Sequence, residues 1–445
     1  MDHPPRPLIA IIGGGASGTL LAWALWQLEA GSRIIILDPS PRPAVGLAYS
    51  TLSPGHFLNV PVRSMSADVR DPDHFLHWVR EHHDPHLSPA AFVPRAVYGR
   101  YLSDLWRQMS PEWLQTTVLF CRRNGGKLEL GLKTGEVIRA DQVVLATGNF
   151  GPAAVAPVSQ DLTKSGRYHP SGWDNDLSDR IAPDASVAMI GTGLTSLDVL
   201  MRLRETGHRG RVVALSRHGW CPESHAVTEP AQSPVIPAST PASVSAFFRA
   251  FRNSLAQGTE WRSAVDALRP QINLLWASLN LTEKKRFRRH LQRRWDIVRH
   301  RVAPEVANFL AIEQAQGTFL CRRGDVIRLG LRGETVELEA RTPDGLAIVS
   351  AEHVVNCTGP SRAYRQMRDS LPRTLLEDGM ARETAFGGLE CHENGALVDG
   401  AGQIQEDLFA IGPMRWGMLV ETTAIPEIRQ QAWDLALLLE TRGKG

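Results

Sequence analysis

Three glycines near the N-terminus have the spacing of a phosphate-binding turn. Gly13, Gly15 and Gly18 stand between an apolar strand predicted at residues 8–12 and a helix predicted from about 16 to 30. The first glycine permits a tight turn, the second lets backbone approach a pyrophosphate, and the third lets the helix pack closely on the strand. The N–H groups at the start of the helix would bind the phosphates. The chemistry indicated is dinucleotide binding.

An acidic residue follows at the distance that this chemistry requires. The second strand, RIIILD, ends at Asp38, which is 38 − 18 = 20 positions beyond Gly18. A carboxylate there hydrogen-bonds a ribose hydroxyl. The turn, its Ser17 and Asp38 together predict an FAD site.

A second turn of the same type occurs far downstream. Gly191 and Gly193 follow the apolar run SVAMI, and Ser196 replaces the third glycine with another small residue. The next strand leads to Ser216 and Arg217 instead of an acid. An arginine there accommodates the 2′-phosphate of NADP. The second turn therefore predicts a nicotinamide site that favours NADPH over NADH, although an arginine after a strand is often simply solvated.

The material after each turn repeats as well. Each half continues with alternating strand-like segments and ends in a buried strand followed by Thr-Gly, at VVLATG (143–148) and at VVNCTG (354–359). Such duplication indicates two nucleotide-binding domains. We expect an α/β fold with two Rossmann-like domains, the second inserted into the first. The expected boundaries are 1–160 and 352–445 for the FAD domain and 161–351 for the NAD(P)H domain, with a mostly helical insert at about 220–315.

The C-terminal segment is predicted to return to the first domain. DLFAIGP reads as a strand and a Gly-Pro turn, and a helix is expected from about Thr422. In two-dinucleotide flavoproteins an acid before such a strand meets the ribityl chain or pyrophosphate, which selects Asp407. Gly412 and Thr422 are expected to face the flavin, where a helix N-terminus stabilises negative charge.

Composition narrows the function classes. The 445 residues are 43% hydrophobic and 22% charged with a formal net charge of +2, so nucleic acid and acidic membranes are not expected partners. The five cysteines form no C-x-x-C pair, which predicts a reduced, cytoplasmic protein and argues against a disulfide framework, a metal site or a dithiol reductase. The uncharged stretch 8–26 could pass for a membrane anchor, but its three successive glycines favour strand, turn and helix. The oligomeric state stays open.

Several less regular segments carry a family resemblance. They are GLAYSTLSPGHFLNVPVRSMSAD (46–68), HFLHWV (74–79), HRVAPEVA (300–307) and ETTAIPEIRQQA (421–432). With the two turns, they make the chain resemble bacterial FAD/NAD(P)-binding flavin-dependent monooxygenases, a family that includes FAD-dependent urate hydroxylase and L-aspartate N-monooxygenase (nitrosuccinate synthase). The resemblance implies that NAD(P)H reduces FAD, that O₂ forms a flavin C4a-hydroperoxide, and that one oxygen atom passes to a small polar substrate.

The same resemblance implies roles for single residues. Asn59 would hydrogen-bond the flavin or its peroxide, with Met65 and Ser66 completing the wall. The alternative is that Asn59 caps a turn and Met65 belongs to the core. The arginines that suggest an anionic substrate are Arg63, Arg95 and Arg415, with Arg415 the catalytic candidate beside Asn59.

The insert contains a strongly basic segment. Residues 284–301 hold nine Lys or Arg residues, and a helix there would present one apolar face. The segment could be a solvated or ion-paired helix, an anion-binding lid that uses Arg299 and Arg301, or a nucleic-acid surface. The near-neutral net charge favours the first.

These observations lead to one main expectation and several alternatives. The main expectation is an FAD-dependent monooxygenase that hydroxylates urate to 5-hydroxyisourate. The alternatives are an amine or amino-acid N-hydroxylase, an RNA-modifying flavoprotein and a redox-sensing flavoprotein.

Overall fold

The computed structural model describes residues 6–174 and 176–442, which divide into two compact units. Unit 1 comprises the chain up to Leu52, residues 60–149 and the chain from Arg362 onward. Unit 2 comprises residues 150–361 together with the short segment 53–59. In the order of the chain, unit 2 therefore interrupts unit 1.

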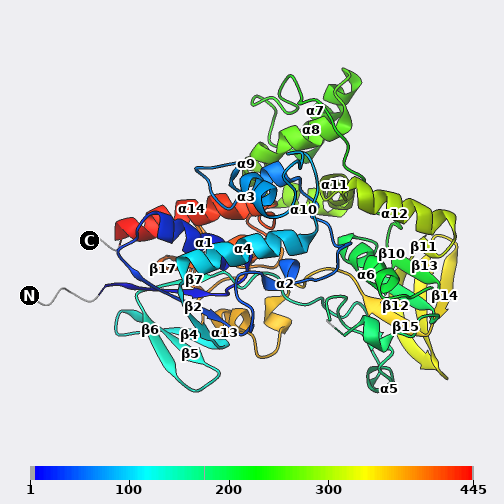
Figure 1. Cartoon of the computed structure of the whole chain (residues 1–445), viewed down its shortest axis with the longest axis horizontal. Helices are drawn as coiled ribbons and strands as arrows, with labels where there is room; N and C mark the ends of the chain where they lie inside the picture. The colour runs from blue at the N-terminus through cyan, green and yellow to red at the C-terminus, as the bar shows by residue number, and fades with distance from the viewer. Residues whose placement is uncertain (1–5, 175, 443–445) are drawn as a thin grey trace, which may run out of the picture. The chain divides into compact units, whose positions relative to one another are not determined.

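The main sheet of unit 1 is parallel except for one edge strand (Figure 1). Its strands, in spatial order, are β16 (Ala396–Val398), β17 (Ile404–Ala410), β7 (Gln142–Leu145), β1 (Leu8–Ile12), β2 (Arg33–Asp38) and β3 (Glu112–Gln115). Strands β1 and β7 are buried along almost their whole length. Continuous burial is typical of parallel strands with helices on both faces, which explains why the sequence of these strands does not alternate.

Helices surround this sheet. Unit 1 contains α1 (Ala16–Gln27), α2 (Gly46–Tyr49), α3 (His74–His82), α4 (Arg95–Met109), α13 (Leu371–Glu377) and α14 (Ile425–Arg442), with short 3-10 turns at Val62–Ser64, Tyr364–Gln366 and Gly412–Arg415. Helix α1 packs against α14 and α4 and is buried on nearly all sides, as its apolar sequence requires. A small antiparallel sheet, β4 (Val118–Asn124), β5 (Lys127–Leu132) and β6 (Val137–Ala140), completes the unit.

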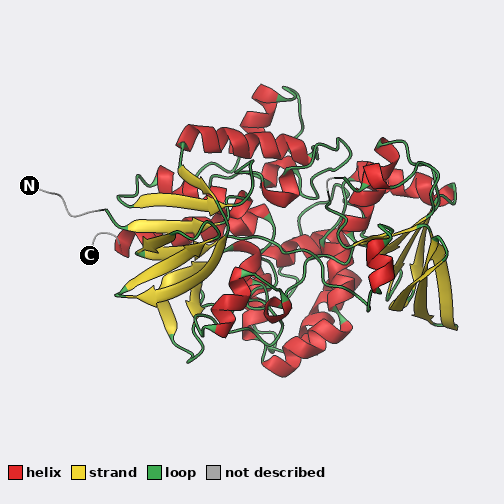
Figure 2. Ribbon diagram, turned by 90° about the horizontal axis from the view of Figure 1, so that it is seen from below, coloured by secondary structure: helices red, strands yellow, loops and turns green. Residues whose placement is uncertain are grey.

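Unit 2 repeats this plan. Its parallel sheet has the order β11 (Phe319–Arg323), β10 (Val212–Ser216), β9 (Val187–Ile190), β15 (His353–Asn356) and β8 (Tyr168–His169). An antiparallel sheet of β12 (Asp325–Arg332), β13 (Thr335–Thr342) and β14 (Gly345–Ala351) packs on it through a shared apolar core. Figure 2 shows these strands gathered into sheets with helices beside them. The predicted α/β fold with two Rossmann-like sheets is confirmed.

The other elements of unit 2 are helical. They are α5 (Gln160–Lys164), α6 (Leu194–Glu205), α7 (Val244–Ala256), α8 (Trp261–Leu268), α9 (Ile272–Ser278), α10 (Leu281–His290), α11 (Gln292–Arg299) and α12 (Pro304–Ala315), with 3-10 turns at Ser178–Arg180 and Arg269–Gln271. The single basic helix predicted at 284–301 is two helices, α10 and α11, because the backbone leaves ideal helical geometry at Leu291, whose φ is −118°.

Two predicted helix boundaries were wrong. Helix α1 ends at Gln27 instead of about residue 30, and Glu29 takes a left-handed conformation with a φ of +50°. Helix α14 begins at Ile425 instead of Thr422. A start at Thr422 would place Pro426 in the helix interior, where proline clashes with the preceding turn, whereas a start at Ile425 puts it in the first turn.

Candidate dinucleotide-binding sites

The first glycine turn has no room for side chains. The φ of Gly13 is +108°, and a Cβ there would lie 2.4 Å from the Ala146 carbonyl oxygen. A Cβ on Gly18 would lie 1.9 Å from the Gly13 carbonyl oxygen. The Gly13 N–H donates to the Leu37 carbonyl at 2.8 Å, which fixes the turn to the end of β2. Gly13 and Gly18 are thus required by backbone geometry and by close helix–strand packing, as predicted.

Asp38 points back at this turn. One carboxylate oxygen accepts the N–H of Gly14 at 2.6 Å, and the other accepts the N–H of Ser40 at 2.7 Å. A carboxylate has about four lone-pair positions, so Asp38 keeps capacity for a ribose hydroxyl. Gly14, the glycine that the spacing pattern ignores, is therefore the residue that links the turn to the acid.

The start of α1 is open to an anion. Gly15 is its N-cap residue, and within this described helix the first turn carries no acidic side chain and no side-chain cap. The first N–H groups of a helix have no intrahelical partner and attract negative charge. A Cβ placed on Gly15 would lie 3.2 Å from the Cα of Gly46, so the backbone at Gly46 lies beside the start of α1. The geometry fits a pyrophosphate.

The turn at Gly412, near the C-terminus, lies beside Ser17 at the start of α1. Gly412 has a φ of +65°, and a Cβ there would lie 2.6 Å from the Ser17 hydroxyl oxygen. The Gly412 N–H donates to the Gln431 side-chain oxygen at 2.9 Å, and the Thr422 hydroxyl donates to the Gly412 carbonyl at 2.7 Å. The structure therefore brings Ser17, Gly412 and Thr422 together, and adds Gln431 of α14, which the sequence reasoning missed.

Asp407 and Arg415 do not join this group. Asp407 lies within β17, three residues before its carboxyl end, and its carboxylate pairs with Arg123 of β4 (Nη2–Oδ1, 2.7 Å). Arg415 is only 5% exposed, and its guanidinium donates to the Glu393 carbonyl at 2.5 Å. Burial lowers the pKa of Arg415. Both side chains are engaged within the protein, so the cofactor contact of Asp407 and the catalytic role of Arg415 stay predictions.

The proposed flavin wall is divided between the units. Asn59 lies in the segment that groups with unit 2, where its backbone carbonyl accepts His225 Nε2 at 3.0 Å. Met65 and Ser66 are buried in unit 1, and the Ser66 hydroxyl donates to the Asp71 carbonyl at 2.6 Å. For Met65 the burial is that of a core residue, as the alternative expects, while the flavin contacts of Asn59 and Ser66 stay predictions.

The second turn reproduces the first. Gly191 has a φ of +114°, a Cβ there would lie 2.5 Å from the Cys357 carbonyl oxygen, and its N–H donates to the Leu215 carbonyl at 2.7 Å. Gly193 is the N-cap of α6, with no described atom within 4 Å of a Cβ placed on it. The Ser196 hydroxyl donates to the Gly193 carbonyl at 2.7 Å and is buried. This turn also fits a dinucleotide.

The position of the acid is occupied by a hydroxyl in unit 2. In the sheet register Ile190 pairs with Leu215, so Ser216 stands where Asp38 stands in unit 1. The Ser216 hydroxyl lies 2.9 Å from the hydroxyl of Thr192, another residue that the sequence reasoning missed. Arg217 follows and is exposed.

A basic and aromatic cluster adjoins this position. His218 stacks on Trp220 with ring centroids 4.5 Å apart, and the Arg294 guanidinium lies 5.3 Å from the Trp220 ring centre. The pKa of His218 is lowered by burial and then by four arginines, Arg217, Arg323, Arg293 and Arg294. Helix α11 of the insert therefore contributes positive charge beside the second turn.

The two arginines singled out in the basic segment are in the interior. Arg299 is 7% exposed and Arg301 is 2% exposed, and Arg301 pairs with Asp266 of α8. Their burial rules out a solvated position for these two arginines, while a contact with an anionic ligand stays a hypothesis. Of the other predicted substrate arginines, Arg63 is exposed and Arg95 is half-buried near Tyr49, whose pKa burial raises to about 12.

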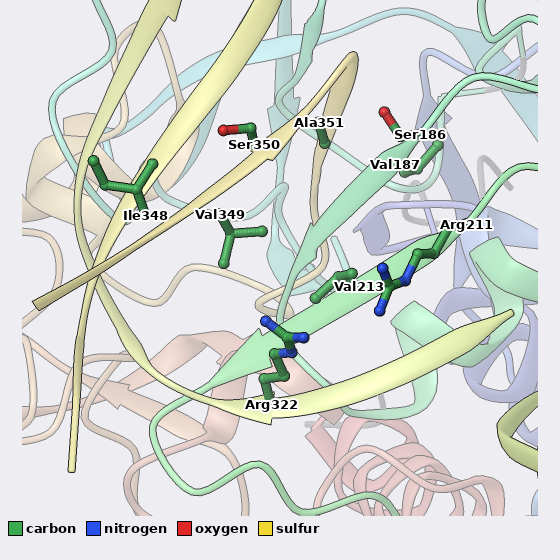
Figure 3. A pocket seen from close by; sticks show the side chains of 9 residues that line it. All are labelled: Ser186, Val187, Arg211, Val213, Arg322, Ile348, Val349, Ser350 and Ala351. Carbon is green, nitrogen blue, oxygen red and sulfur yellow. The ribbon is translucent and has the colours of Figure 1, made fainter. Parts of the chain in front are cut away.

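A cavity of about 190 Å³ occupies a different part of unit 2 (Figure 3). It lies at the amino ends of β9 and β10, and its lining consists of Ser186, Val187, Arg211, Val213, Arg322, Ile348, Val349, Ser350 and Ala351. Dinucleotides bind at the carboxyl ends of parallel strands. The cavity therefore lies away from the second turn and is not part of it.

All five cysteines are free thiols, but two that are distant in sequence lie together. Cys221 and Cys321 are 100 residues apart in sequence, but their sulfur atoms lie 2.7 Å apart. Spacing in sequence could not reveal this pair, because the strand order of unit 2 brings it together.

Among the described residues no cluster of His, Cys, Asp and Glu is arranged to hold a metal ion. In the same described ranges none of the helices has the length and hydropathy that a membrane crossing requires.

Comparison with known proteins agrees with this geometry. Residues 10–150 match the FAD-NAD(P)-binding family NAD_binding_9. The uncharacterized protein YdhS of Escherichia coli K12 is 24% identical over 212 residues, which are 43% of this chain and 38% of that protein's length.

Two solved structures are similar over nearly the whole chain. The ornithine N-hydroxylase of Kutzneria sp. 744, with reduced FAD, NADP⁺ and L-ornithine, has a TM-score of 0.70 at 15% identity and covers 99% of this chain and 100% of its own. The L-lysine 6-monooxygenase of Pseudomonas syringae has a TM-score of 0.69 at 15% identity with the same coverage. The chain has the fold of flavoproteins that bind two dinucleotides, and its residues 10–150 match an FAD-NAD(P)-binding family.

Proposed function

We propose that this protein is an FAD-dependent, NADPH-driven monooxygenase that hydroxylates the nitrogen of a small amine. The observation that carries the proposal is the pair of matching glycine turns, at Gly13 and Gly191, each on its own parallel sheet. The support for N-hydroxylation is the likeness over the full chain to proteins that act on ornithine and lysine. It favours this alternative over urate hydroxylation.

Each turn is assigned one dinucleotide. The first turn, with Asp38 available for ribose, would hold FAD, and the start of α1 would bind its pyrophosphate. The second turn would hold NADPH, because Ser216 brings no carboxylate against a 2′-phosphate and Arg217 adds a charge partner. When bound, FAD would accept a hydride from NADPH and activate O₂ for transfer of one oxygen atom to the substrate.

The chain's own contribution is binding and orientation. Gly412, Thr422 and Gln431 form a fixed network beside Ser17, so the C-terminal turn can hold one shape next to the first site. The polar link between Thr192 and Ser216 does the same in the second site. Rigid supporting contacts of this kind keep a site close to its productive geometry.

The urate expectation has less support than the amine alternative. It relied on three arginines that could meet an anionic heterocycle, and one of them, Arg415, is buried against backbone carbonyls. Arg63 is exposed and Arg95 is half-buried.

The test uses purified protein supplied with FAD, NADPH and ¹⁸O₂. Ornithine, lysine, cadaverine and urate are offered separately, and products are identified by mass spectrometry while NADPH oxidation and hydrogen peroxide are followed. The proposal predicts an N-hydroxylated amine that contains one ¹⁸O atom, with less peroxide formed per NADPH than without substrate. Labelled hydroxyisourate from urate, with no labelled amine, would overturn it in favour of purine hydroxylation.

A further inference from the structure

The contact between Cys221 and Cys321 is part of the architecture of unit 2. Cys321 belongs to β11, where it pairs in register with Ala214 of β10. Cys221 follows the loop that leaves β10. Their sulfur atoms are 2.7 Å apart, and both residues are half-buried. A disulfide bond of about 2.05 Å needs only a small further approach.

The backbone immediately before Cys221 is held in place by contacts with the strands of unit 2. Gly219 has a φ of +68°, and a Cβ there would lie 2.9 Å from the Arg323 nitrogen, so the loop presses directly on β11. The Gly219 N–H donates to the Ser216 hydroxyl at 3.0 Å, and the Trp220 carbonyl accepts the hydroxyl of Thr192. These contacts place Cys221 next to Cys321.

The two thiols are chemically unequal. The hydrogen bond from Cys321 lowers the pKa of Cys221, while the same bond and burial raise the pKa of Cys321. The thiolate is the reactive form of cysteine, so Cys221 is the better nucleophile of the pair and Cys321 is placed to resolve it.

We propose that Cys221 and Cys321 form a reversible disulfide when the protein meets hydrogen peroxide. The Cys221 thiolate attacks the O–O bond and becomes a sulfenic acid, with release of hydroxide. The Cys321 sulfur then attacks the Cys221 sulfur, forms the S–S bond, and its proton leaves with the hydroxyl group as water. In total two thiols lose two electrons and two protons, and one peroxide becomes two waters. A dithiol reductant reverses the step by thiol–disulfide exchange.

The disulfide would cross-link the loop that carries Arg217 and His218 to β11. This loop is the proposed binding surface for the 2′-phosphate of NADPH, and this part of the inference rests on the proposed function. Oxidation is therefore expected to change NADPH affinity and leave FAD content unchanged, because the first turn belongs to unit 1.

The experiment first measures the cross-link itself. Full-length protein is treated with stoichiometric peroxide, alkylated and digested without reduction, and the peptides are mapped. The proposal predicts a Cys221–Cys321 peptide pair that dithiothreitol removes. Cys221→Ser and Cys321→Ser must each abolish it, whereas Cys121→Ser, a change at a buried thiol in β4, must leave it intact.

Two mapping results would overturn the proposal. One is a sulfinic acid on Cys221 with Cys321 still open to alkylation, and the other is pairing of either cysteine with a different partner. The peptide map does not require activity, so it decides the question even if no substrate is ever turned over.

The second readout is the rate of flavin reduction against NADPH concentration, before and after oxidation. A change of threefold or more in the half-saturating concentration, absent in Cys321→Ser, supports the link to NADPH. An unchanged value with the cross-link present overturns that link. If NADPH never reduces the flavin of the untreated protein, the proposed function fails while the mapped disulfide still stands.

Discussion

The two units build the same glycine turn with a different residue beside it. In unit 1 the Gly13 N–H donates to the Leu37 carbonyl, and the residue after Leu37 is Asp38. In unit 2 the Gly191 N–H donates to the Leu215 carbonyl, and the residue after Leu215 is Ser216. The hydrogen bonds that shape the two turns match within 0.1 Å, at 2.8 and 2.7 Å. The residue after the second strand differs. Backbone register thus builds the same turn twice, while under the proposed function one side chain would decide which ribose each turn accepts.

The largest expected effect comes from closing the first turn. Gly13→Ala places a Cβ 2.4 Å from the Ala146 oxygen at a φ of +108°. Backbone strain and overpacking of this kind cost about 2–5 kcal/mol together. We expect a protein with a markedly lower melting temperature and almost no bound FAD, measured by calorimetry and by flavin absorbance. Gly31→Ala, where no described atom lies within 4 Å of the new Cβ, is the matched control and should keep both. Full FAD occupancy in Gly13→Ala would contradict the account.

The second turn offers a gentler change. Gly193→Ala meets nothing in the described protein, so the fold and the FAD content should stay normal. The added methyl would instead occupy the path by which a pyrophosphate approaches the start of α6. We expect the KM for NADPH to rise at least about tenfold, which equals about 1.4 kcal/mol. A KM within twofold of the parent protein would mean that no dinucleotide binds there.

Replacing Ser216 by an acidic residue should shift the preference of the second turn from NADPH towards NADH. Ser216→Asp places a carboxylate next to the proposed 2′-phosphate, so the ratio of kcat/KM for NADPH to that for NADH should fall by about tenfold. Ser216→Asn, a polar change without charge, is the control and should shift the ratio much less. An unchanged ratio in Ser216→Asp would place the 2′-phosphate elsewhere.

Acid should weaken unit 2 through its buried histidines. The pKa of His169 is lowered to about 4 by burial and then by His353, and that of His225 to about 4 by burial and then by Arg301. Because each folded pKa lies below the unfolded value of about 6.5, the stabilisation is complete above pH 6.5 and is lost as pH falls towards 4. The protection factors of the β8 and β15 peptides, which correct for the slower intrinsic amide exchange in acid, should fall at about pH 5, and His169→Gln should reduce this fall. Equal protection factors at about pH 5 and pH 7.5 would contradict the sign.

The smallest effect is expected at Asp407, whose cofactor contact is untested and whose carboxylate pairs with Arg123. Asp407→Asn should leave FAD affinity within about twofold, because the carboxylate is bound by Arg123 and not by a ligand. The lost ion pair should lower stability by about 1 kcal/mol or less. A large loss of FAD affinity, measured by fluorescence titration, would restore Asp407 to the site.

The sequence predicted those features that depend on local backbone. Glycine spacing located both turns, and the apolar runs located β1, β9 and β15, because tight turns and buried parallel strands leave direct marks in the sequence. It could not predict where long-range partners would lie. The Arg123 partner of Asp407, the carbonyl partners of Arg415 and the Cys221–Cys321 contact all come from segments joined only by the fold. Thr192 was detectable in principle, since it occupies the middle of its turn as Gly14 does in the first.

The central claim is that FAD and NADPH use separate turns, and anaerobic flavin reduction in Gly191→Ala tests it most directly. A Cβ at this position would lie 2.5 Å from the Cys357 oxygen, inside unit 2. The account predicts a yellow protein with normal FAD content that dithionite bleaches but NADPH does not. Loss of FAD from a folded Gly191→Ala, or bleaching by NADPH at the parent rate, would contradict it.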